Sequence, residues 1–131
     1  MRVLCLHGVG TNGRILDSQT VAFRSLLPGN WEWHFVDGIS SIYDGPYSCY
    51  YIDPSPENIQ NAMDLVHEVM DEEGPFDAVM AFSQGAALAA SIILNHQLTH
   101  PFDPPLFRLA IFLCANLPFS WTPNHATTSP P

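Results

Sequence analysis

Hydrophobic and polar positions divide the chain into short apolar runs and longer segments with a helical period. The apolar runs have the length of β-strands and lie at residues 3–6, 31–36, 76–82 and 107–115. The helical segments lie between them, at residues 15–27, 55–74 and 84–98. This alternation of short apolar strands with helices predicts an α/β fold, in which helices cover both faces of a parallel sheet.

The clearest predicted helix begins after Ser55. Ser55 suits the N-cap, Pro56 suits the first helical position, and Glu57 suits the positive end of the helix dipole. Gly74 and the proline after it end the helix. Apolar residues recur at helical spacing in between and form one stripe, made of Ile59, Met63, Val66 and Met70. We therefore expect one face of this helix to be buried.

Residues 39–54 form a long segment without a helical period. The segment contains four tyrosines, which are Tyr43, Tyr47, Tyr50 and Tyr51. Loops of this length are usually functional or disordered. The aromatic content favours an ordered loop that faces a substrate.

The length of 131 residues fits a single domain. We assign that domain to residues 1–120. Residues 121–131 contain Pro, Thr and Ser and show no period, so we expect them to form an unstructured tail.

The chain is acidic, with thirteen Asp and Glu against four basic residues, all of them Arg, and a net charge of −9. This balance argues against nucleic acid and anionic membrane surfaces as partners. No segment approaches the roughly 20 apolar residues of a membrane span. Cys5, Cys49 and Cys114 are an odd set without metal-ligand spacing, which favours a reducing, cytoplasmic compartment. We expect no metal and no cofactor.

A nucleophile elbow is indicated at residues 81–85, where a predicted strand gives way to a predicted helix. Ser83 stands in the middle with Gly85 after it, as in the pattern G-x-S-x-G, but Ala81 replaces the first glycine. Such a turn pushes the serine hydroxyl out of the carboxyl end of the sheet. The alternative is that Ser83 only caps the helix.

A serine nucleophile also needs donors that stabilise an oxyanion. The backbone N–H of Gln84 opens the helix, and the N–H of Val9 lies in the glycine-rich turn after the first strand. Gly8 and Gly10 allow the close approach of this turn. We interpret His7 as a brace for the turn and not as the catalytic base. A phosphate-binding loop is an alternative, although G-x-G-x-x-G and the Walker lysine are both missing.

Other polar residues have weaker functional interpretations. His96 and His100 are spaced as in H-E-x-x-H, but Gln97 replaces the Glu, so we favour solvated histidines at a helix end over a zinc site. Asp37 follows a predicted strand, where it either caps a loop or faces the site.

Several motifs together resemble the fungal serine hydrolases of the FSH family, which are α/β-hydrolases. The resemblance covers about residues 2–120 and is carried by Leu6-His7-Gly8, Thr11-Asn12, Gln19-Thr20, Phe35-Val36-Asp37-Gly38, Phe82-Ser83-Gln84-Gly85 and Ala115-Asn116-Leu117-Pro118-Phe119. It implies the N-terminal portion of a three-layer α/β-hydrolase sandwich with a mostly parallel sheet.

The resemblance also implies a chemistry. Members of this family act as esterases or thioesterases, some beside polyketide synthases, on acyl esters or carrier-bound thioesters. Ser83 is then the nucleophile, and the amides of Val9 and Gln84 form the oxyanion hole. An apolar or aromatic acyl group would suit the tyrosine-rich segment.

The acid and base of the triad are unassigned. Chain order in this fold is Ser, then Asp or Glu, then His. After Ser83 the chain offers one acid, Asp103, and the histidines His96, His100 and His125. None matches the family's positions, which follow later strands.

Three interpretations therefore stay open. The chain is the N-terminal portion of a serine hydrolase, a short relative that binds an acyl ligand without turnover, or a non-functional remnant. In each case the strand at 107–115 is expected to be an exposed sheet edge through which chains oligomerise.

Overall fold

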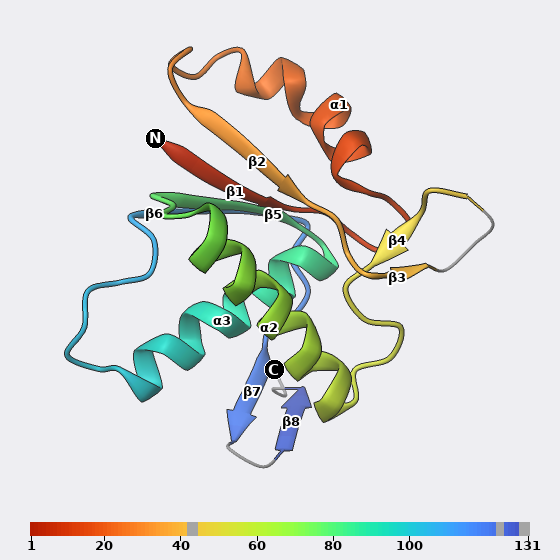
Figure 1. Cartoon of the computed structure of the whole chain (residues 1–131), viewed down its shortest axis with the longest axis vertical. Helices are drawn as coiled ribbons and strands as arrows, with labels where there is room; N and C mark the ends of the chain where they lie inside the picture. The colour runs from red at the N-terminus through yellow and green to blue at the C-terminus, as the bar shows by residue number, and fades with distance from the viewer. Residues whose placement is uncertain (42–44, 123–124, 129–131) are drawn as a thin grey trace.

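The computed structural model describes residues 1–41, 45–122 and 125–128 (Figure 1). No helix in this described part is long and apolar enough to cross a membrane. The elements are, in chain order, β1 (Arg2–Leu6), α1 (Gly13–Arg24), β2 (Glu32–Val36), β3 (Ser40–Ser41), β4 (Ser48–Cys49), α2 (Pro56–Glu73), β5 (Ala78–Phe82), α3 (Gln84–Thr99), β6 (Leu109–Leu113), β7 (Phe119–Thr122) and β8 (His125–Thr128).

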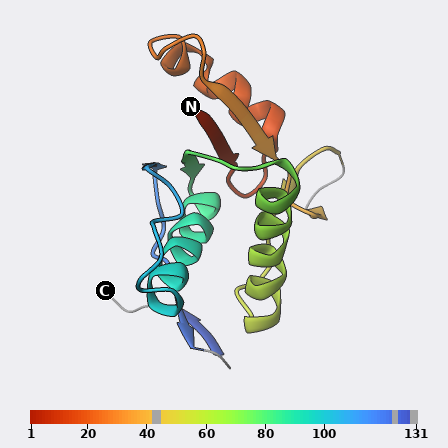
Figure 2. The same ribbon diagram turned by 60° about the vertical axis from the view of Figure 1, so that its left-hand side comes forward.

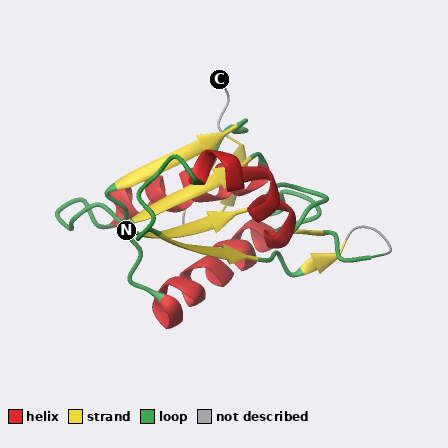
Figure 3. Ribbon diagram, turned by 90° about the horizontal axis from the view of Figure 1, so that it is seen from above, coloured by secondary structure: helices red, strands yellow, loops and turns green. Residues whose placement is uncertain are grey.

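A parallel sheet forms the middle layer. Its four strands pair in the order β2-β1-β5-β6. All four point the same way, so their carboxyl ends meet at one edge (Figure 3). Helix α1 covers one face, and α2 and α3 lie side by side on the other (Figures 1 and 2). The predicted α/β architecture, a parallel sheet with helices on both faces, is confirmed.

Alternating side chains of β1 enter different cores on the two faces of the sheet. Leu4 and Leu6 pack in the core shared with α2 and α3. Val3 and Cys5 pack in the second core, with Leu16 of α1. Successive strand residues point to opposite faces, so an unbroken apolar run such as residues 3–6 suits a strand that is covered on both sides.

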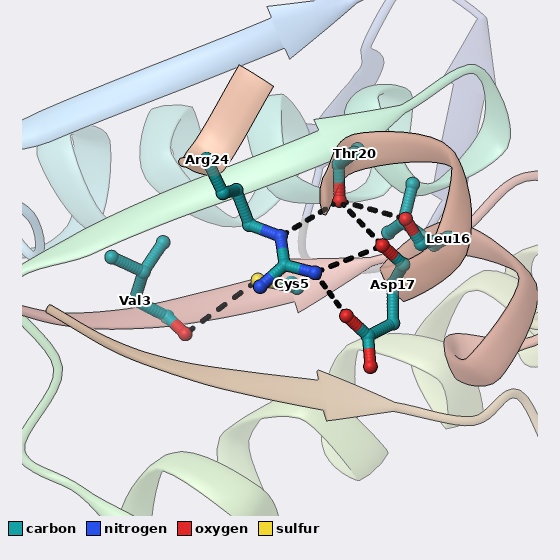
Figure 4. Close-up of polar contacts among 6 residues, drawn as sticks. All are labelled: Val3, Cys5, Leu16, Asp17, Thr20 and Arg24. Atoms are coloured by element: carbon teal, nitrogen blue, oxygen red, sulfur yellow. Dashed lines mark hydrogen bonds and ion pairs between the residues drawn. The ribbon is translucent and has the colours of Figure 1, made fainter. Parts of the chain in front are cut away.

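Arg24 fastens the end of α1 to the sheet (Figure 4). Its Nε donates to Thr20 Oγ1 at 3.0 Å, and its guanidinium pairs with Asp17. The same guanidinium lies over the rings of Trp33 and Phe35, at 5.4 and 5.2 Å from their centroids. The cation–π contacts thus hold α1 against β2, and the ion pair with Asp17 fixes the Arg24 side chain within α1.

All three cysteines are free thiols. Cys5 and Cys49 are buried, and Cys114 is exposed. Burial raises the pKa of Cys5 to about 12, although the charge of Arg24 acts in the opposite direction. Because the thiolate is the reactive form, Cys5 is a packing residue and not a nucleophile.

The ends of the predicted elements shift by a few residues. The cap of α2 is confirmed, since the Ser55 hydroxyl accepts a hydrogen bond from the N–H of Asn58. Helix α1 begins at Gly13, earlier than predicted, because the Asn12 side chain accepts from the N–H of Ile15 and acts as its N-cap.

The tyrosines of the segment 39–54 do not all face outward. Tyr50 and Tyr51 are buried core residues, so the prediction of substrate-facing tyrosines is wrong for both. Tyr47 is exposed, and Tyr43 lies outside the described residues. In the described part of the segment, β3 and β4 form a short antiparallel pair.

The prediction of an unstructured tail at 121–131 is wrong for residues 121–122 and 125–128. β7 and β8 pair antiparallel, from Phe119 opposite Thr128 to Thr122 opposite His125. The hairpin is anchored at its start, where Phe119 is buried and donates its N–H to Ser91 Oγ at 2.8 Å. Residues 123–124 and 129–131 of the predicted tail lie outside the described residues.

β6 is an edge strand with apolar side chains in solvent. It pairs with β5 on one side and with no other strand of the described part of the chain. Leu109 is 37% exposed and Phe112 is 42% exposed. Unpaired backbone groups beside exposed apolar side chains favour pairing with another chain.

We expect the protein to self-associate through β6. Replacing Phe112 by Lys should weaken association about tenfold or more, since burying a phenylalanine side chain contributes about 1.5–3 kcal/mol. Sedimentation velocity over a concentration series measures this effect. Leu98→Lys is the control, because Leu98 is 71% exposed on α3. A wild-type protein that stays monomeric throughout the series would contradict the prediction.

Candidate active site

Ser83 occupies a strained turn between β5 and α3. Its backbone angles are φ 51° and ψ −111°, in the positive-φ region that residues other than glycine rarely adopt. The turn is held by two backbone hydrogen bonds, from the N–H of Ser83 to Leu113 O at 3.0 Å and from the N–H of Ala87 to Ser83 O at 3.1 Å. The Ser83 side chain makes no capping hydrogen bond to the helix, so the simple N-cap interpretation has no support here.

Two glycines let the turn approach the carboxyl end of β1. A Cβ on Gly85 would lie 2.5 Å from the carbonyl oxygens of both Leu6 and His7. A Cβ on Gly8 would lie 3.3 Å from Ser83 Cβ. The serine and the glycine-rich turn at 7–10 are therefore in direct contact, as the sequence predicts.

His7 joins the turns that follow β1 and β2. Its Nδ1 lies 2.7 Å from Gly8 O, and its Nε2 accepts from the N–H of Gly38 at 2.9 Å. The Gly38 donor requires a lone pair on Nε2, which places the proton on Nδ1. Burial lowers the pKa of His7, outweighing the hydrogen bond to Gly8 and the charge of Asp37, which both raise it. His7 is thus a neutral ring that holds the turn.

Tyr50 packs on His7 and closes the same network. The two rings stack with centroids 4.7 Å apart. The Tyr50 hydroxyl donates to Val36 O at 2.6 Å and accepts from the N–H of His7 at 3.0 Å. Burial raises the pKa of this hydroxyl far above its usual range, so it remains a donor. Sequence reasoning missed this role, because it treated the tyrosine as part of a substrate-facing loop.

The Gln84 side chain fixes the segment that carries Tyr50. Its Oε1 accepts from the N–H of Tyr50, and its Nε2 donates to Tyr51 O, both at 2.8 Å. Gln84 is 4% exposed. Sequence reasoning considered only its backbone N–H. A long amide among the small apolar residues of α3 was the available signal, since buried amides need partners.

Of the two predicted oxyanion donors, Gln84 directly follows Ser83, and Val9 follows Gly8, which packs against Ser83. Val9 belongs to the exposed turn, and Gln84 is the first residue of α3. Within the described residues, neither backbone N–H donates to another backbone group. Gly10 has φ 73°, which turns the chain back to pair with Ser48. The oxyanion role of these amides stays a prediction.

The candidate triad residues that follow Ser83 in the chain lie at the far end of α3. They are His96, His100 and Asp103. His96 is twelve positions beyond Gln84, which is roughly 18 Å along a helix axis. Its Nε2 lies 3.0 Å from Pro104 O, and its ring stacks on His100 at 5.2 Å. The N–H of Asp103 donates to His100 O, so Asp103 shares this location. None of the three is brought to Ser83, and the side chain of His125 lies outside the described residues.

Asp37 supports the local fold, and His96 and His100 do not form a metal site with other described residues. Asp37 Oδ1 accepts from the N–H of Gly13 at 2.7 Å and so supports the start of α1. Across the described residues, no group of three or more His, Cys, Asp or Glu side chains is placed to hold a metal ion. The described residues therefore offer no third ligand for a zinc ion at His96 and His100.

Two adjoining hollows lie near the start of α1, with volumes of about 300 and 410 Å³. They share the wall residues Asn12, Arg14, Pro46 and Tyr47. Ser83 lines neither of them. Neither of these two hollows therefore includes the predicted nucleophile.

Replacing Gly85 by Ala should lower the free energy of unfolding by about 1–3 kcal/mol or more, because the new methyl group would overlap two carbonyl oxygens. Urea denaturation measures this change. Gly29→Ala is the matched control, since a Cβ there meets nothing within 4 Å. Equal stabilities for the two variants would show that the elbow does not approach β1 this closely.

Stability should fall in mild acid because of His7. Its folded pKa lies below the ordinary value of 6.5, so the unfolded chain binds the proton first as the pH falls through 6.5. The stabilisation from the neutral ring is present above 6.5 and is lost as the pH falls toward the folded pKa, with a slope of up to about 1.4 kcal/mol per pH unit. Urea denaturation of wild type and His7→Gln between pH 7.5 and 5 should show a smaller slope for the variant; equal slopes would refute this role.

Comparisons with known proteins find a matching family and similar relatives. The family described as serine hydrolase (FSH1) matches residues 1–127. Esterase FPY3 of Fusarium mangiferae is 43% identical over 91% of this chain and 59% of its own length. Hydrolase FUB4 of Gibberella moniliformis is 36% identical over 92% of this chain and 49% of its own length. The chain thus spans about half the length of the curated relatives it matches.

The fold also matches a solved structure. The crystal structure of SOBER1 from Arabidopsis thaliana aligns with a TM-score of 0.55 and 23% sequence identity, over 72% of this chain and 54% of that chain. At this identity the likeness concerns the fold, which is that of the α/β-hydrolases. Together with the family match over residues 1–127, this shows that the chain belongs to the FSH1 family of serine hydrolases.

Proposed function

We propose that the protein is an esterase or thioesterase that cleaves acyl esters or carrier-bound thioesters, with Ser83 as the nucleophile. The observation that carries this proposal is the strained backbone of Ser83, with φ 51° at the carboxyl end of β5. Non-glycine residues in this conformation concentrate at functional sites. Named relatives are an esterase and a hydrolase, which supports the same chemistry.

In the proposed reaction the Ser83 Oγ attacks the acyl carbonyl carbon. Its proton passes to a general base, and the carbonyl oxygen becomes an oxyanion held by the amides of Val9 and Gln84. Collapse of this intermediate expels the alcohol or thiol and leaves an acyl-serine ester, which water then hydrolyses. Packing of Gly8 against Ser83 keeps the Val9 turn beside the reacting atom.

Within the described residues, no histidine that follows Ser83 lies near the elbow, so a general base is not assigned. His96 and His100 lie at the opposite end of α3. This observation favours a second candidate function, in which the chain binds an acyl group with little or no turnover.

Finer assignments follow from the family resemblance. We propose that the acyl substrate comes from fungal polyketide secondary metabolism and that the protein acts in the cytoplasm. The free thiols of Cys5 and Cys49 support a reducing compartment.

Covalent labelling tests the nucleophile. A fluorophosphonate probe should add to Ser83 and not to a Ser83→Ala variant, with intact-protein mass spectrometry and peptide mapping as the readout. Ser18→Ala, on the exposed surface of α1, should label like wild type. Labelling of Ser83→Ala at the wild-type rate would refute the assignment.

The rate of labelling tests whether the chain lacks a general base that activates Ser83. Loss of a triad histidine in a serine protease lowers kcat by on the order of 10⁶-fold, so Ser83 should react orders of magnitude more slowly than the serine of an active esterase. A comparable rate would show that the chain does activate its nucleophile.

A further inference from the structure

Three large aliphatic side chains stand in solvent around the elbow. Val9 is 52% exposed, Ile52 is 69% exposed and Leu117 is 54% exposed. They belong to three different segments, which follow β1, β4 and β6. Because the carboxyl ends of parallel strands meet at one edge of the sheet (Figure 3), the segments after β1 and β6 lie at the edge that carries Ser83. The segment after β4, which belongs to the separate antiparallel pair, is tied to the same edge by the hydrogen bond from Gln84 to Tyr51.

Contacts of the neighbouring residues locate the backbone of Val9 and of Ile52 relative to the elbow. Val9 follows Gly8, whose Cβ position is 3.3 Å from Ser83 Cβ. Ile52 follows Tyr51, whose carbonyl oxygen accepts from Gln84 Nε2 at 2.8 Å. Both are therefore one residue away from a contact with the elbow.

The third side chain lies on a segment that is tied to the elbow at one end and to α3 at the other. Leu113 accepts the N–H of Ser83, and Phe119 donates its N–H to Ser91 Oγ in the second turn of α3. Leu117 lies between these two attachment points. The rings of Phe119 and Tyr51 meet edge to face at 5.6 Å, which brings the segments of Leu117 and Ile52 together.

The chain near these side chains carries no charge. Residues 8–10, 50–52 and 113–119 contain no Asp, Glu, Lys or Arg, although the protein as a whole has a net charge of −9. The nearest acid along the chain, Asp53, accepts the N–H of Ser55 at 3.1 Å at the start of α2. An exposed, uncharged aliphatic surface that surrounds a functional residue is typical of a ligand-binding surface.

We propose that Val9, Ile52 and Leu117 form the acyl-binding surface of the protein and that the acyl group it selects is an aliphatic chain. The inference rests on the proposed function for its link to Ser83. It assigns the acyl preference to aliphatic side chains and not to the tyrosines of residues 39–54, because Tyr50 and Tyr51 are buried. Each methylene in full apolar contact should strengthen binding by roughly fourfold.

Methyl NMR on the wild-type protein tests the surface directly, with sodium octanoate and sodium acetate as the probes. Octanoate should shift the methyl signals of Val9, Ile52 and Leu117 in a saturable manner, and acetate should not. Leu98 is the control, since it is 71% exposed at the far end of α3. Equal shifts at Leu98, or no shifts at the three residues, would overturn the proposal.

Acylation kinetics separate this inference from the proposed function. p-Nitrophenyl octanoate should acylate Ser83 at least tenfold faster than p-nitrophenyl acetate, and Ile52→Asn and Leu117→Asn should each lower the ratio of the octanoate rate to the acetate rate. Leu98→Asn, at the far end of α3, is the matched control and should leave this ratio at its wild-type value. Equal rates for the two esters would overturn the inference and leave the hydrolase assignment intact.

Two further outcomes are informative. Failure of both esters to acylate Ser83, together with saturable octanoate binding at the three residues, would support the acyl-binding surface and count against the hydrolase. Shifts of the same methyl signals on dilution without octanoate would show that a second copy of the chain covers the surface, which would overturn the proposal.

Discussion

The close approach of α3 to the end of β1 is the constraint on which the site depends. Gly85 faces the carbonyl oxygens of Leu6 and His7 with no room for a Cβ, and the same approach places Gly8 against Ser83. A side chain at either glycine would separate the serine from the turn that carries the predicted oxyanion donor. The geometry of the site is therefore set by the packing of a helix on a sheet, and the serine inherits its strained backbone from that packing.

Buried hydrogen bonds hold the neighbouring segments in one arrangement. The His7 ring takes the N–H of Gly38, the Tyr50 hydroxyl links the backbone of His7 and Val36, and the Gln84 amide holds the backbone of Tyr50 and Tyr51. A buried polar group costs free energy unless its partners are in place. These three side chains consequently favour one register of the turns around the elbow, and the neutral form of His7 is part of that arrangement.

Local patterns made much of this predictable from the sequence. Strands, the cap at Ser55 and the elbow at Ser83 depend on residues adjacent in the chain, and all appear where such patterns predict them within a few residues. The amide clamp of Gln84 reaches a backbone 34 residues away, which no local pattern encodes. The hairpin at 119–128 was missed for a related reason, since its composition is that of a tail and its anchor, Phe119, binds Ser91 on a distant helix.

The nucleophile and its base place different demands on the chain. The position of Ser83 and the amides of Val9 and Gln84 arise from two adjoining turns of backbone. A base must bring a side chain from another segment to within about 3 Å of the serine hydroxyl, and the described histidines beyond Ser83 lie at the opposite end of α3. The strained turn is nevertheless fully formed, because the contacts that hold it are those of Leu113, Ala87 and Gly85 with their neighbours. Strain at Ser83 therefore supports the proposed position of the nucleophile and carries no information on how fast it reacts.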